Sequence, residues 1–514
     1  MTSDVTALWG SDPLATADGR PWDLLIVGGG TAGLVAAHTA AGFGASTLLV
    51  ERHRTGGDCL WTGCVPSKAF LAAAHAAEDA RSAAAFGVHT GVVEVDFTAV
   101  MAHVQAAITT IEPVDAPPAL RTGGAHVAQG TVRFTGPSTA EVDGTTVRFT
   151  QALLATGSAP VVPEIRGLAA ADPLTSDSVW SLSELPRRLL VLGGGAVGCE
   201  LGQGFARLGS HVTLVEVAPR LLPGETPAAS AALAAAFVAD GIDVRTGHEV
   251  VAVEPGDDGT RVRLRDGSIV TVDRILVAAG RRPRTADLGL DAAGVAVTES
   301  GHIVVDDRLR TTHARIWAAG DLTGHAPFTH VAGVHGSLAA SNAVLGLRRR
   351  VQPDLVPRVT YTQPEVASFG VEAGSRPGLT VRTTRHHDVD RAITEGRTGG
   401  HSTLVLDARG RVVGASLVGP RAGESLAELL LAAQQGLRAR SLAGAMHAYP
   451  TWADGPWKSA LAQGRADLAA TPTRQVIGAL AALRRLRLTA VRAAGHSSDQ
   501  PGGLRDASGR RRRA

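Results

Sequence analysis

Residues 22–33 read WDLLIVGGGTAG, and this stretch decides the fold. Its apolar residues predict a buried strand, and Gly28, Gly30 and Gly33 follow as a GxGxxG loop. An alanine-rich helix comes next, and a second strand ends at Glu51, 18 residues after the last glycine. In this order the glycines let a pyrophosphate approach the helix N-terminus, and the carboxylate accepts hydrogen bonds from ribose hydroxyls. GxGxxG alone is a weak signal, but the full pattern predicts a dinucleotide-binding unit.

The same pattern recurs in the segment RLLVLGGGAVGCELGQGFARLGSHVTLVE, which covers residues 188–216. Its loop glycines are Gly193, Gly195 and Gly198. Glu216 again follows the last glycine by 18 residues, so the chain is predicted to bind two dinucleotides. Glu216 favours NADH at the second loop, because a carboxylate repels the 2′-phosphate of NADPH. Arg220 lies close enough in sequence to weaken that preference.

The segment GGDCLWTGCVPSK, residues 56–68, holds two of the three cysteines, Cys59 and Cys64, and one of only two lysines, Lys68. A helix is expected from about residue 62, which places Cys64 and Lys68 four residues apart on one face. A helix N-terminus and a nearby ammonium lower the pKa of a thiol. Cys59 is expected in an irregular turn before the helix, because the two sulfurs could not otherwise meet. The segment predicts a redox-active cysteine pair; two unrelated buried thiols are the alternative.

Composition limits the class of protein. A length of 514 residues predicts about three domains, and a chain that is 44% hydrophobic and 19% charged is globular. The net charge of +2 gives no argument for nucleic acid, and three cysteines suit a reducing cytoplasm better than a disulfide framework. No secretory signal opens the chain, and no apolar run reaches the ~20 residues that span a bilayer. The histidines show no metal-ligand spacing, so no metal site is predicted.

Further segments make the chain resemble the pyridine nucleotide-disulfide oxidoreductases, the family of dihydrolipoamide dehydrogenase, glutathione reductase and mercuric reductase. The resemblance covers roughly residues 21–466. Besides the cysteine segment it rests on four motifs: LLATGSAP (153–160), ILVAAGRRP (275–283), IWAAGDLTG (316–324) and PRVTYTQPEVASFG (357–370). It implies an α/β fold with two Rossmann-like dinucleotide-binding domains, as in glutathione reductase, an α+β C-terminal dimerisation domain, and a homodimer.

The resemblance also implies a division of the chain into an FAD-binding domain (21–160 and 284–353), an NAD(P)H-binding domain (161–283) and a dimerisation domain (354–468). Outside the resemblance we expect a disordered extension (1–20) and a helical basic tail (469–514).

By the same resemblance the first loop binds FAD and the second binds NAD(P)H. Cys64 is the sulfur against the flavin, and as a thiolate it forms a charge-transfer complex with the flavin. Cys59 is the interchange sulfur, which faces the substrate. Lys68 and Glu200 match an ion pair near the flavin; on its own, Glu200 would only stabilise a helix N-terminus. The implied FAD residues are Gly28, Gly30, Gly33, Glu51, Lys68, Thr156, Gly157, Asp321 and Ala332. The implied NAD(P)H residues are Gly193, Gly195, Gly198, Glu216, Arg220 and Gly280.

The chain departs from the family where a catalytic base is expected. In the segment HAYPTWAD, Tyr449 occupies the position of the family's histidine, Asp454 that of its glutamate, and His447 lies two residues early. Tyrosine, with a usual pKa near 10, is a poor base; the alternative is that it only packs at the interface. Mercuric reductase also has tyrosine at this position. In this chain, however, no cysteine follows Cys199, so the tail cannot deliver Hg(II) through a thiol pair. Cys199 itself is expected to be a small buried residue.

We therefore expect an FAD-dependent NAD(P)H oxidoreductase that resembles mercuric reductase and passes electrons through the disulfide Cys59/Cys64 to a small disulfide, metal ion or other acceptor. A lipoamide-dehydrogenase-like disulfide reductase and a direct flavin-to-quinone reductase are alternatives, and a redox-silent scaffold is the least favoured. Near the C-terminus, residues 474–494 are helical by composition, and their arginines, with Arg510–Arg513, suit an anionic surface. A solvated or self-packed helix is the more usual reading, so membrane contact is not the expectation.

Overall fold

The first glycine loop lies at the centre of a seven-stranded sheet in the computed structural model, which describes residues 10–496. The strand order is β3-β2-β1-β6-β5-β4, with β17 beside β6. The strands are β1 (Trp22–Val27), β2 (Thr47–Glu51), β3 (His126–Gln129), β4 (Val132–Gly136), β5 (Thr139–Val142), β6 (Thr145–Leu154) and β17 (Ile316–Ala318). β1 pairs in parallel with β2 and β6, and its apolar residues are buried as the sequence predicts.

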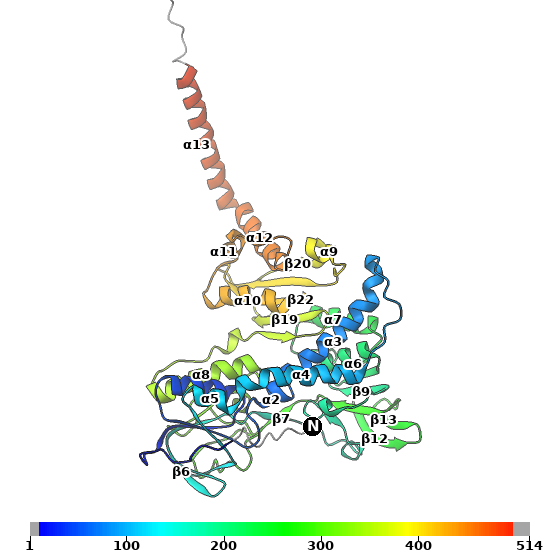
Figure 1. Ribbon diagram of the computed structural model, residues 1–514. Helices are drawn as coiled ribbons and strands as arrows, with labels where there is room; N and C mark the ends of the chain where they lie inside the picture. The colour runs from blue at the N-terminus through cyan, green and yellow to red at the C-terminus, as the bar shows by residue number, and fades with distance from the viewer. Residues whose placement is uncertain (1–9, 497–514) are drawn as a thin grey trace, which may run out of the picture.

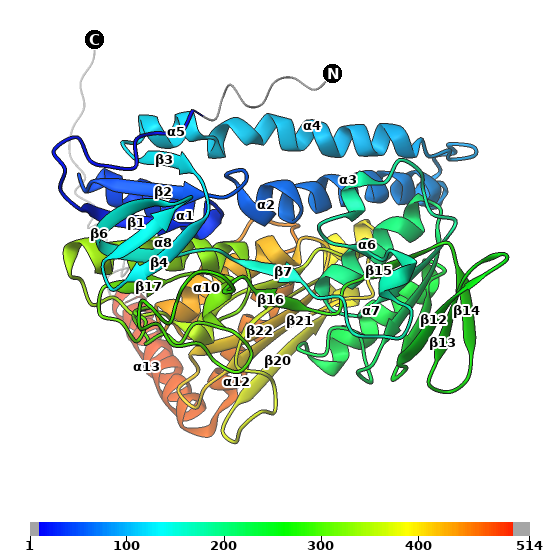
Figure 2. The ribbon, with the colours of Figure 1, turned by 90° about the horizontal axis from the view of Figure 1, so that it is seen from below.

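Helices cover this sheet and extend from it. They are α1 (Thr31–Gly42), α2 (Gly57–Trp61), α3 (Cys64–Ser82), α4 (Phe97–Asp115), α5 (Pro117–Thr122) and α8 (Thr329–Leu345). α1 packs against α8, while α3 and α4 run side by side toward the second sheet (Figure 2). α3 begins with Cys64 of the cysteine segment and packs against α6 of the second unit, so it links the first unit to the second.

The second glycine loop opens a similar unit. Its parallel sheet has the order β11-β10-β9-β15-β8, and a separate antiparallel sheet has the order β12-β13-β14. The strands are β8 (Leu174–Thr175), β9 (Arg188–Leu192), β10 (His211–Glu216), β11 (Asp243–Thr246), β12 (Val250–Gly256), β13 (Gly259–Leu264), β14 (Ile269–Val272) and β15 (Arg274–Val277). The helices are α6 (Ala196–Leu208) and α7 (Pro227–Ala239). The chain passes from the first unit to the second after β7 (Ser158–Pro160) and returns after β16 (Arg281–Pro283). These two strands pair with each other, so the two connections form one small sheet.

A third, antiparallel sheet follows, with the order β18-β19-β22-β21-β20. Its strands are β18 (Arg358–Thr360), β19 (Glu365–Gly370), β20 (Thr380–Arg385), β21 (His401–Leu406) and β22 (Val412–Gly419). Its helices are α9 (Asp390–Thr394), α10 (Ala422–Gln434), α11 (Ala439–Gly444) and α12 (Asp454–Ala469). A last helix, α13 (Thr471–His496), projects away from everything else (Figure 1). The predicted α/β class, with two dinucleotide-binding units and an α+β C-terminal unit, is confirmed.

The N-terminal extension differs in part from the expected disorder. Residues 10–20 are described, and they lie along the edge of the first sheet. Asp12 accepts a hydrogen bond from the backbone of Val127, at 2.7 Å, and forms an ion pair with Arg121, at 3.0 Å. The polar composition suggested disorder, but a carboxylate that meets an edge strand and a guanidinium fixes the segment. Residues 1–9 and 497–514, which include Arg510–Arg513, lie outside the described residues, and the exact domain boundaries stay a prediction.

We predict that Gly336 is fixed by the contact of α8 with α1. A Cβ at Gly336 would lie 2.2 Å from the carbonyl oxygen of Ala32, whereas one at Gly333 would make ordinary contacts with methyl groups of Thr31, at 3.7 Å, and Val35, at 3.8 Å. Gly336→Ala should therefore lower the free energy of unfolding by about 1–3 kcal/mol through overpacking. Gly333→Ala, on the same helix, should be neutral or stabilise by up to about 1 kcal/mol. Thermal unfolding of both variants tests this, and equal midpoints would contradict it.

Candidate functional site

The two cysteines of the predicted pair lie on two consecutive helices, one short and one long. Cys59 is on α2, and Cys64 is the first residue of α3. A Cβ on Gly63 would lie 2.8 Å from the carbonyl oxygen of Asp58, so a glycine is needed where α3 starts against α2. Both cysteines are half-buried free thiols. The helix begins at Cys64, two residues later than expected, and Cys59 sits in a short helix in place of an irregular turn.

The surroundings of the two thiols favour ionisation of Cys64. A hydrogen bond from the thiol of Cys59, a contact of 3.1 Å with the hydroxyl of Thr329 and the charge of Lys68 together lower the pKa of Cys64 to about 6, although burial opposes them. The pKa of Cys59 is raised, because its proton is held in the bond to Cys64 and because the thiol is buried. The pair is therefore asymmetric: Cys64 carries the thiolate, and Cys59 carries the proton.

An ion pair anchors this arrangement. Nζ of Lys68 lies 2.8 Å from Oε2 of Glu200, whose side chain is only 8% exposed. Oε1 of Glu200 accepts a hydrogen bond from the backbone of Tyr361, at 3.0 Å, and Lys68 lies 4.3 Å above the ring of Tyr361. The predicted pairing of Lys68 with Glu200 is thus present in the structure, and Tyr361 is a partner that the sequence did not indicate.

A cavity of about 1420 Å³ joins the first glycine loop to the cysteine pair. Every residue in the set predicted for FAD lines it except Gly33, and so do Cys59, Cys64 and Glu200. The first residues of four helices, α1, α3, α6 and α8, also line it. Helix N-termini present free N–H groups and partial positive charge, so the cavity suits an anionic, elongated ligand.

The glycines of the first loop fit a dinucleotide for steric reasons. A Cβ at Gly28 would lie 2.5 Å from the carbonyl oxygen of Ala155, and one at Gly33 would lie 1.9 Å from that of Gly28. At Gly30, by contrast, the nearest atom, Cα of Gly57, would be 3.7 Å away, so a Cβ there would make only an ordinary van der Waals contact. Glu51 accepts hydrogen bonds from the backbone of Gly29, at 2.6 Å, and of His53, at 2.8 Å. These residues fit FAD, with a compact loop around an open approach to α1.

The second loop repeats this geometry. A Cβ at Gly193 would lie 2.5 Å from the carbonyl oxygen of Ala278, one at Gly198 would lie 1.9 Å from that of Gly193, and Gly195 faces open space. The other predicted glycine, Gly280, also faces open space and has a φ of +127°.

The polar side chains at the second loop differ in their roles. Glu216 accepts hydrogen bonds from the backbone of Gly194, at 2.6 Å, and of Ala218, at 2.7 Å. The guanidinium of Arg220 instead donates to the carbonyl oxygens of Pro223, at 2.9 Å, and Glu225, at 3.4 Å. Arg220 therefore binds its own loop, and none of the second set of residues lines the large cavity.

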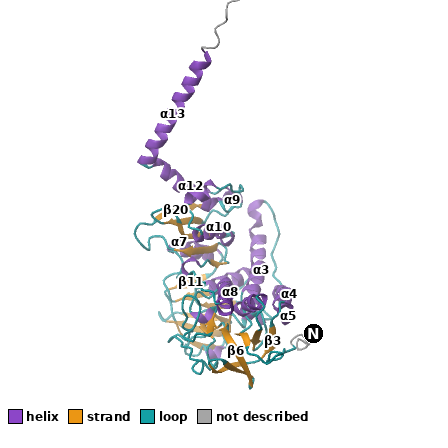
Figure 3. Cartoon of the chain, turned by 90° about the vertical axis from the view of Figure 1, so that its left-hand side faces the viewer, coloured by secondary structure: helices purple, strands orange, loops and turns teal. Residues whose placement is uncertain are grey.

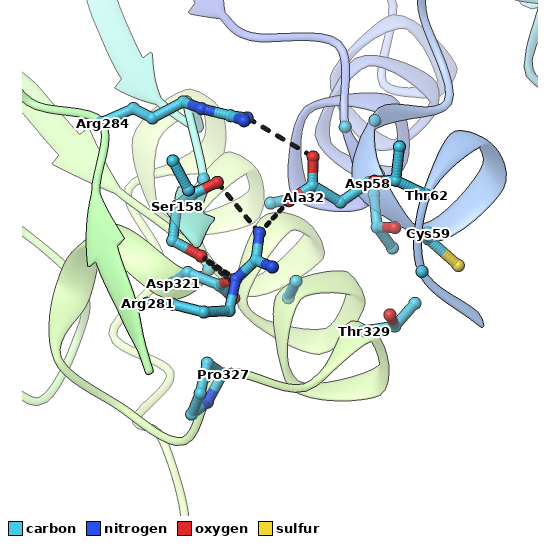
Figure 4. A pocket seen from close by; sticks show the side chains of 18 of the residues that line it. Ala32, Asp58, Cys59, Thr62, Ser158, Arg281, Arg284, Asp321, Pro327 and Thr329 are labelled. Atoms are coloured by element: carbon cyan, nitrogen blue, oxygen red, sulfur yellow. Dashed lines mark hydrogen bonds and ion pairs between the residues drawn. The ribbon is translucent and has the colours of Figure 1, made fainter. Parts of the chain in front are cut away.

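A cluster of charges beside Cys59 was missed by the sequence reasoning (Figure 4). The carboxylate of Asp58 pairs with the guanidinium of Arg281 and lies 3.4 Å from that of Arg284. Nε of Arg281 donates to the hydroxyl of Ser158, at 2.7 Å, which in turn donates to Asp321, at 2.6 Å. The two arginines neutralise a carboxylate next to the redox pair. Arg281 lies within the motif at 275–283 and Arg284 directly follows it. Neither is near Asp58 in the sequence, so no sequence pattern indicated the pairing.

The residues at the departure from the family lie apart from the cavity. Tyr449 is 68% exposed, and its hydroxyl donates to Asp390, which raises the pKa of Tyr449. His447 pairs with Glu428, at 3.0 Å. Asp454 is buried and accepts only from the backbone of Thr451, at 3.3 Å.

None of these three residues lines the cavity within this one chain. The structure therefore does not bring them to Cys59. The third cysteine, Cys199, is fully buried, as the sequence predicts. Over residues 10–496 no cluster of three or more His, Cys, Asp or Glu could hold a metal ion, and no helix is long and apolar enough to cross a membrane.

Comparison with known proteins agrees with this geometry. Residues 22–336 match the pyridine nucleotide-disulphide oxidoreductase family, and residues 356–460 match its dimerisation domain. A mercuric reductase of Streptomyces lividans is 38% identical over 447 residues, which are 84% of this chain and 94% of the relative. A dihydrolipoyl dehydrogenase of Chlamydia muridarum is 33% identical over 465 residues, 88% of this chain and 99% of the relative.

A solved structure gives the same result for the fold. The crystal structure of LpdA from Mycobacterium tuberculosis has a TM-score of 0.79 at 26% identity and covers 86% of this chain and 99% of its own. The predicted glutathione-reductase-like architecture is thereby confirmed, and members of this family use FAD and NAD(P)H. Because one family match spans more than half of the sequence and the relatives align over most of it, the chain belongs to the pyridine nucleotide-disulphide oxidoreductases.

Proposed function

We propose that this FAD-dependent NAD(P)H oxidoreductase passes electrons through Cys59 and Cys64 to a small acceptor that needs little proton transfer, as in a mercuric-reductase-like enzyme. One observation supports the proposal most strongly. The electron-transferring side is complete, with a low-pKa Cys64 beside Lys68, whereas the position of the family's base holds a tyrosine whose pKa is raised. The acceptor is therefore one whose reduction a hydrogen-bond donor can assist and for which no catalytic base is needed.

The chain's own residues divide the work. Gly28, Gly30, Gly33, Glu51, Thr156, Gly157, Asp321 and Ala332 would hold FAD along the cavity, with Lys68 at its far end. Bound FAD supplies two-electron transfer between a reduced nicotinamide and the disulfide. When those two electrons break the S–S bond, Cys64 leaves as the stabilised thiolate and Cys59 takes up one proton. Cys59 is then the thiol that meets the acceptor, and the acceptor's reduction re-forms the disulfide.

NADH is the favoured reductant in this proposal. Glu216 stands where the ribose hydroxyls would lie, and a carboxylate there repels a 2′-phosphate. Arg220 does not oppose this, because its guanidinium binds the carbonyl oxygens of its own loop. Gly193, Gly195, Gly198 and Gly280 would leave room for the backbone to approach the pyrophosphate.

The match to the family's dimerisation domain supports a homodimer, in which the third unit of one chain meets the cavity of the other. Tyr449 and Asp390 would then face Cys59 of the partner subunit. A dithiol pair that turns over with each cycle fits the reducing cytoplasm. Neither nucleic acid nor a bound metal cofactor enters the proposal.

Two other acceptors stay open as alternatives. A lipoamide-type disulfide is one, because a dihydrolipoyl dehydrogenase is 33% identical to this chain. Direct reduction of a quinone at the flavin is the other, and it would not use the cysteines. The experiments below separate these readings.

The Cys59→Ser variant tests the disulfide relay. It should abolish NADH-dependent reduction of disulfides and soft metal ions, because no second sulfur remains to accept electrons. Cys199→Ala is the matched control, since Cys199 is buried away from the pair, and it should keep full activity. The assay is NADH oxidation against lipoamide, glutathione disulfide, Hg(II) and a quinone. Full activity of Cys59→Ser toward all four would mean that the cysteines are bypassed.

We predict that Cys64 of the reduced protein is alkylated by iodoacetamide with a pH midpoint of about 6, below the ordinary 9.0 of a thiol. The pKa is lowered, so the reactive thiolate is lost as the pH falls through 6 and is fully present above it. Cys59→Ala removes the hydrogen bond that contributes most, so the midpoint should rise. Mass spectrometry of the labelled peptides resolves Cys64 from Cys199. A midpoint near 9 in the unmodified protein would refute the proposed asymmetry.

The Tyr449→His variant tests the proton supply. The unmodified protein should reduce lipoamide and glutathione disulfide poorly, because tyrosine cannot protonate and deprotonate thiols near neutrality. An imidazole at position 449 should raise kcat with lipoamide by up to about 10²-fold, the lower range for general acid–base catalysis. Tyr449→Phe is the control and should give no gain. Lipoamide turnover by the unmodified protein at about 10 per second, an ordinary enzymatic rate, would show that another group serves as the base.

A further inference from the structure

Among the described residues, 10–496, the last helix packs on no element except the end of α12, from which it continues. α13 (Thr471–His496) follows α12 after a single residue, Ala470, and extends into open space in two perpendicular views (Figures 1 and 3). The family match ends at residue 460, so α13 lies beyond the dimerisation domain. Its arrangement therefore excludes one of the two ordinary expectations for such a tail, which is a helix packed on its own protein.

α13 exposes many large apolar side chains. They are Val476 (59%), Ile477 (44%), Leu480 (63%), Leu483 (51%), Leu486 (69%), Leu488 (49%) and Val491 (69%). Val476, Leu480 and Leu483 follow the spacing i, i+4, i+7, which places them on one face of a helix. A merely solvated helix would not carry this series, because water disfavours each exposed leucine. The second ordinary expectation is thus disfavoured as well.

The charges of α13 are all of one sign. Residues 471–496 contain five arginines and no lysine, aspartate or glutamate. Arg485 comes nine residues after Val476, and at about 3.6 residues per turn this places it on the opposite side of the helix. Arg474 lies on that same side, whereas Arg484 and Arg487 fall among the apolar residues, with Arg487 between Val476 and Leu480 around the helix. The helix therefore has a mainly apolar side that carries two arginines, a basic side and no acidic residue.

The charges of α13 indicate which kind of partner the helix binds. A second copy of α13 would bring another five arginines against the first five, with no carboxylate to pair with them, so self-association is opposed by like charges. An anionic lipid surface satisfies both faces at once, because headgroups pair with the arginines while the acyl boundary receives the leucines. We propose that α13 binds the surface of an anionic lipid bilayer, lying in its plane and holding the oxidoreductase beside it.

The test uses the full-length, FAD-loaded protein and sedimentation with vesicles. It should sediment with vesicles of phosphatidylcholine mixed with phosphatidylglycerol and not with vesicles of phosphatidylcholine alone. The variant Leu480→Gln/Leu483→Gln should bind about tenfold more weakly or worse, because it removes two side chains from the apolar face. The matched control, Ala481→Gln/Ala482→Gln, introduces the same residue at neighbouring exposed positions and should bind normally. Arg484→Gln/Arg487→Gln should also bind more weakly.

Rates of NADH oxidation should be equal in all of these proteins, which shows that each variant is folded and that the site is unaffected. Equal binding of the leucine variant and its alanine control would overturn the proposal, and so would a lack of binding to anionic vesicles. Light scattering measures the size of the assembly and so tests the alternative, in which α13 binds a second copy of the chain. A Leu480- and Leu483-dependent assembly larger than a dimer, without vesicle binding, would identify a second copy as the partner and refute the lipid proposal.

Discussion

The ion pair of Lys68 and Glu200 is the interaction on which the organisation of the site depends. Lys68 comes from α3 of the first unit and Glu200 from α6 of the second, and Glu200 also accepts the backbone N–H of Tyr361 from the third. A carboxylate that is 8% exposed is stable only when its charge is paired and hydrogen-bonded. Three units of the chain therefore meet at one buried carboxylate, and Cys64 lies one helical turn from Lys68, its partner in the ion pair.

The cavity shows a second constraint, which is electrostatic. α1, α3, α6 and α8 all begin at its wall, so partial positive charge is concentrated there. This favours an anionic cofactor and also a thiolate at Cys64, the first residue of α3. Asp58 adds a negative charge next to Cys59, and the pairing with Arg281 and Arg284 compensates it. The same surroundings can therefore bind pyrophosphate and stabilise a thiolate.

The two glycine loops could be predicted from the sequence because their constraints are local, whereas the architecture as a whole was implied by the resemblance to a family. Gly33 and Gly198 are required by contacts with Gly28 and Gly193, five residues away, and such spacing is visible in sequence. The cluster of Asp58 with Arg281 could not be predicted, because its members are 223 residues apart and only tertiary structure joins them.

Three smaller differences have similar causes. The short helix around Cys59 depends on Gly63 packing against Asp58, which no periodicity signals. The order of residues 10–20 depends on one carboxylate at a sheet edge. The direction of Arg220 depends on carbonyl oxygens of its own loop, whereas its position in sequence suggested a role at the ribose.

The third unit is where this chain lacks the histidine base that the resemblance led us to expect, and its contacts bear on the acceptor in the proposed function. Asp390 accepts a hydrogen bond from the hydroxyl of Tyr449 on one oxygen, and its other oxygen lies 3.2 Å from Nζ of Lys458. Lys458 is the second of the chain's two lysines, so both of them pair with carboxylates close to positions that the family uses for catalysis.

Asp390 therefore stays a carboxylate and keeps Tyr449 protonated, as a donor of a hydrogen bond. His447, the other group that could have served as a base, pairs with Glu428 and packs at a tilt against the ring of Trp457, with 5.6 Å between ring centroids. In the proposed function the electron path through Cys59 and Cys64 is kept, and Tyr449 offers a hydrogen-bond donor at the position of the family's base. Such a donor would stabilise negative charge that develops on an acceptor, which favours acceptors whose reduction does not wait for a thiolate to be protonated.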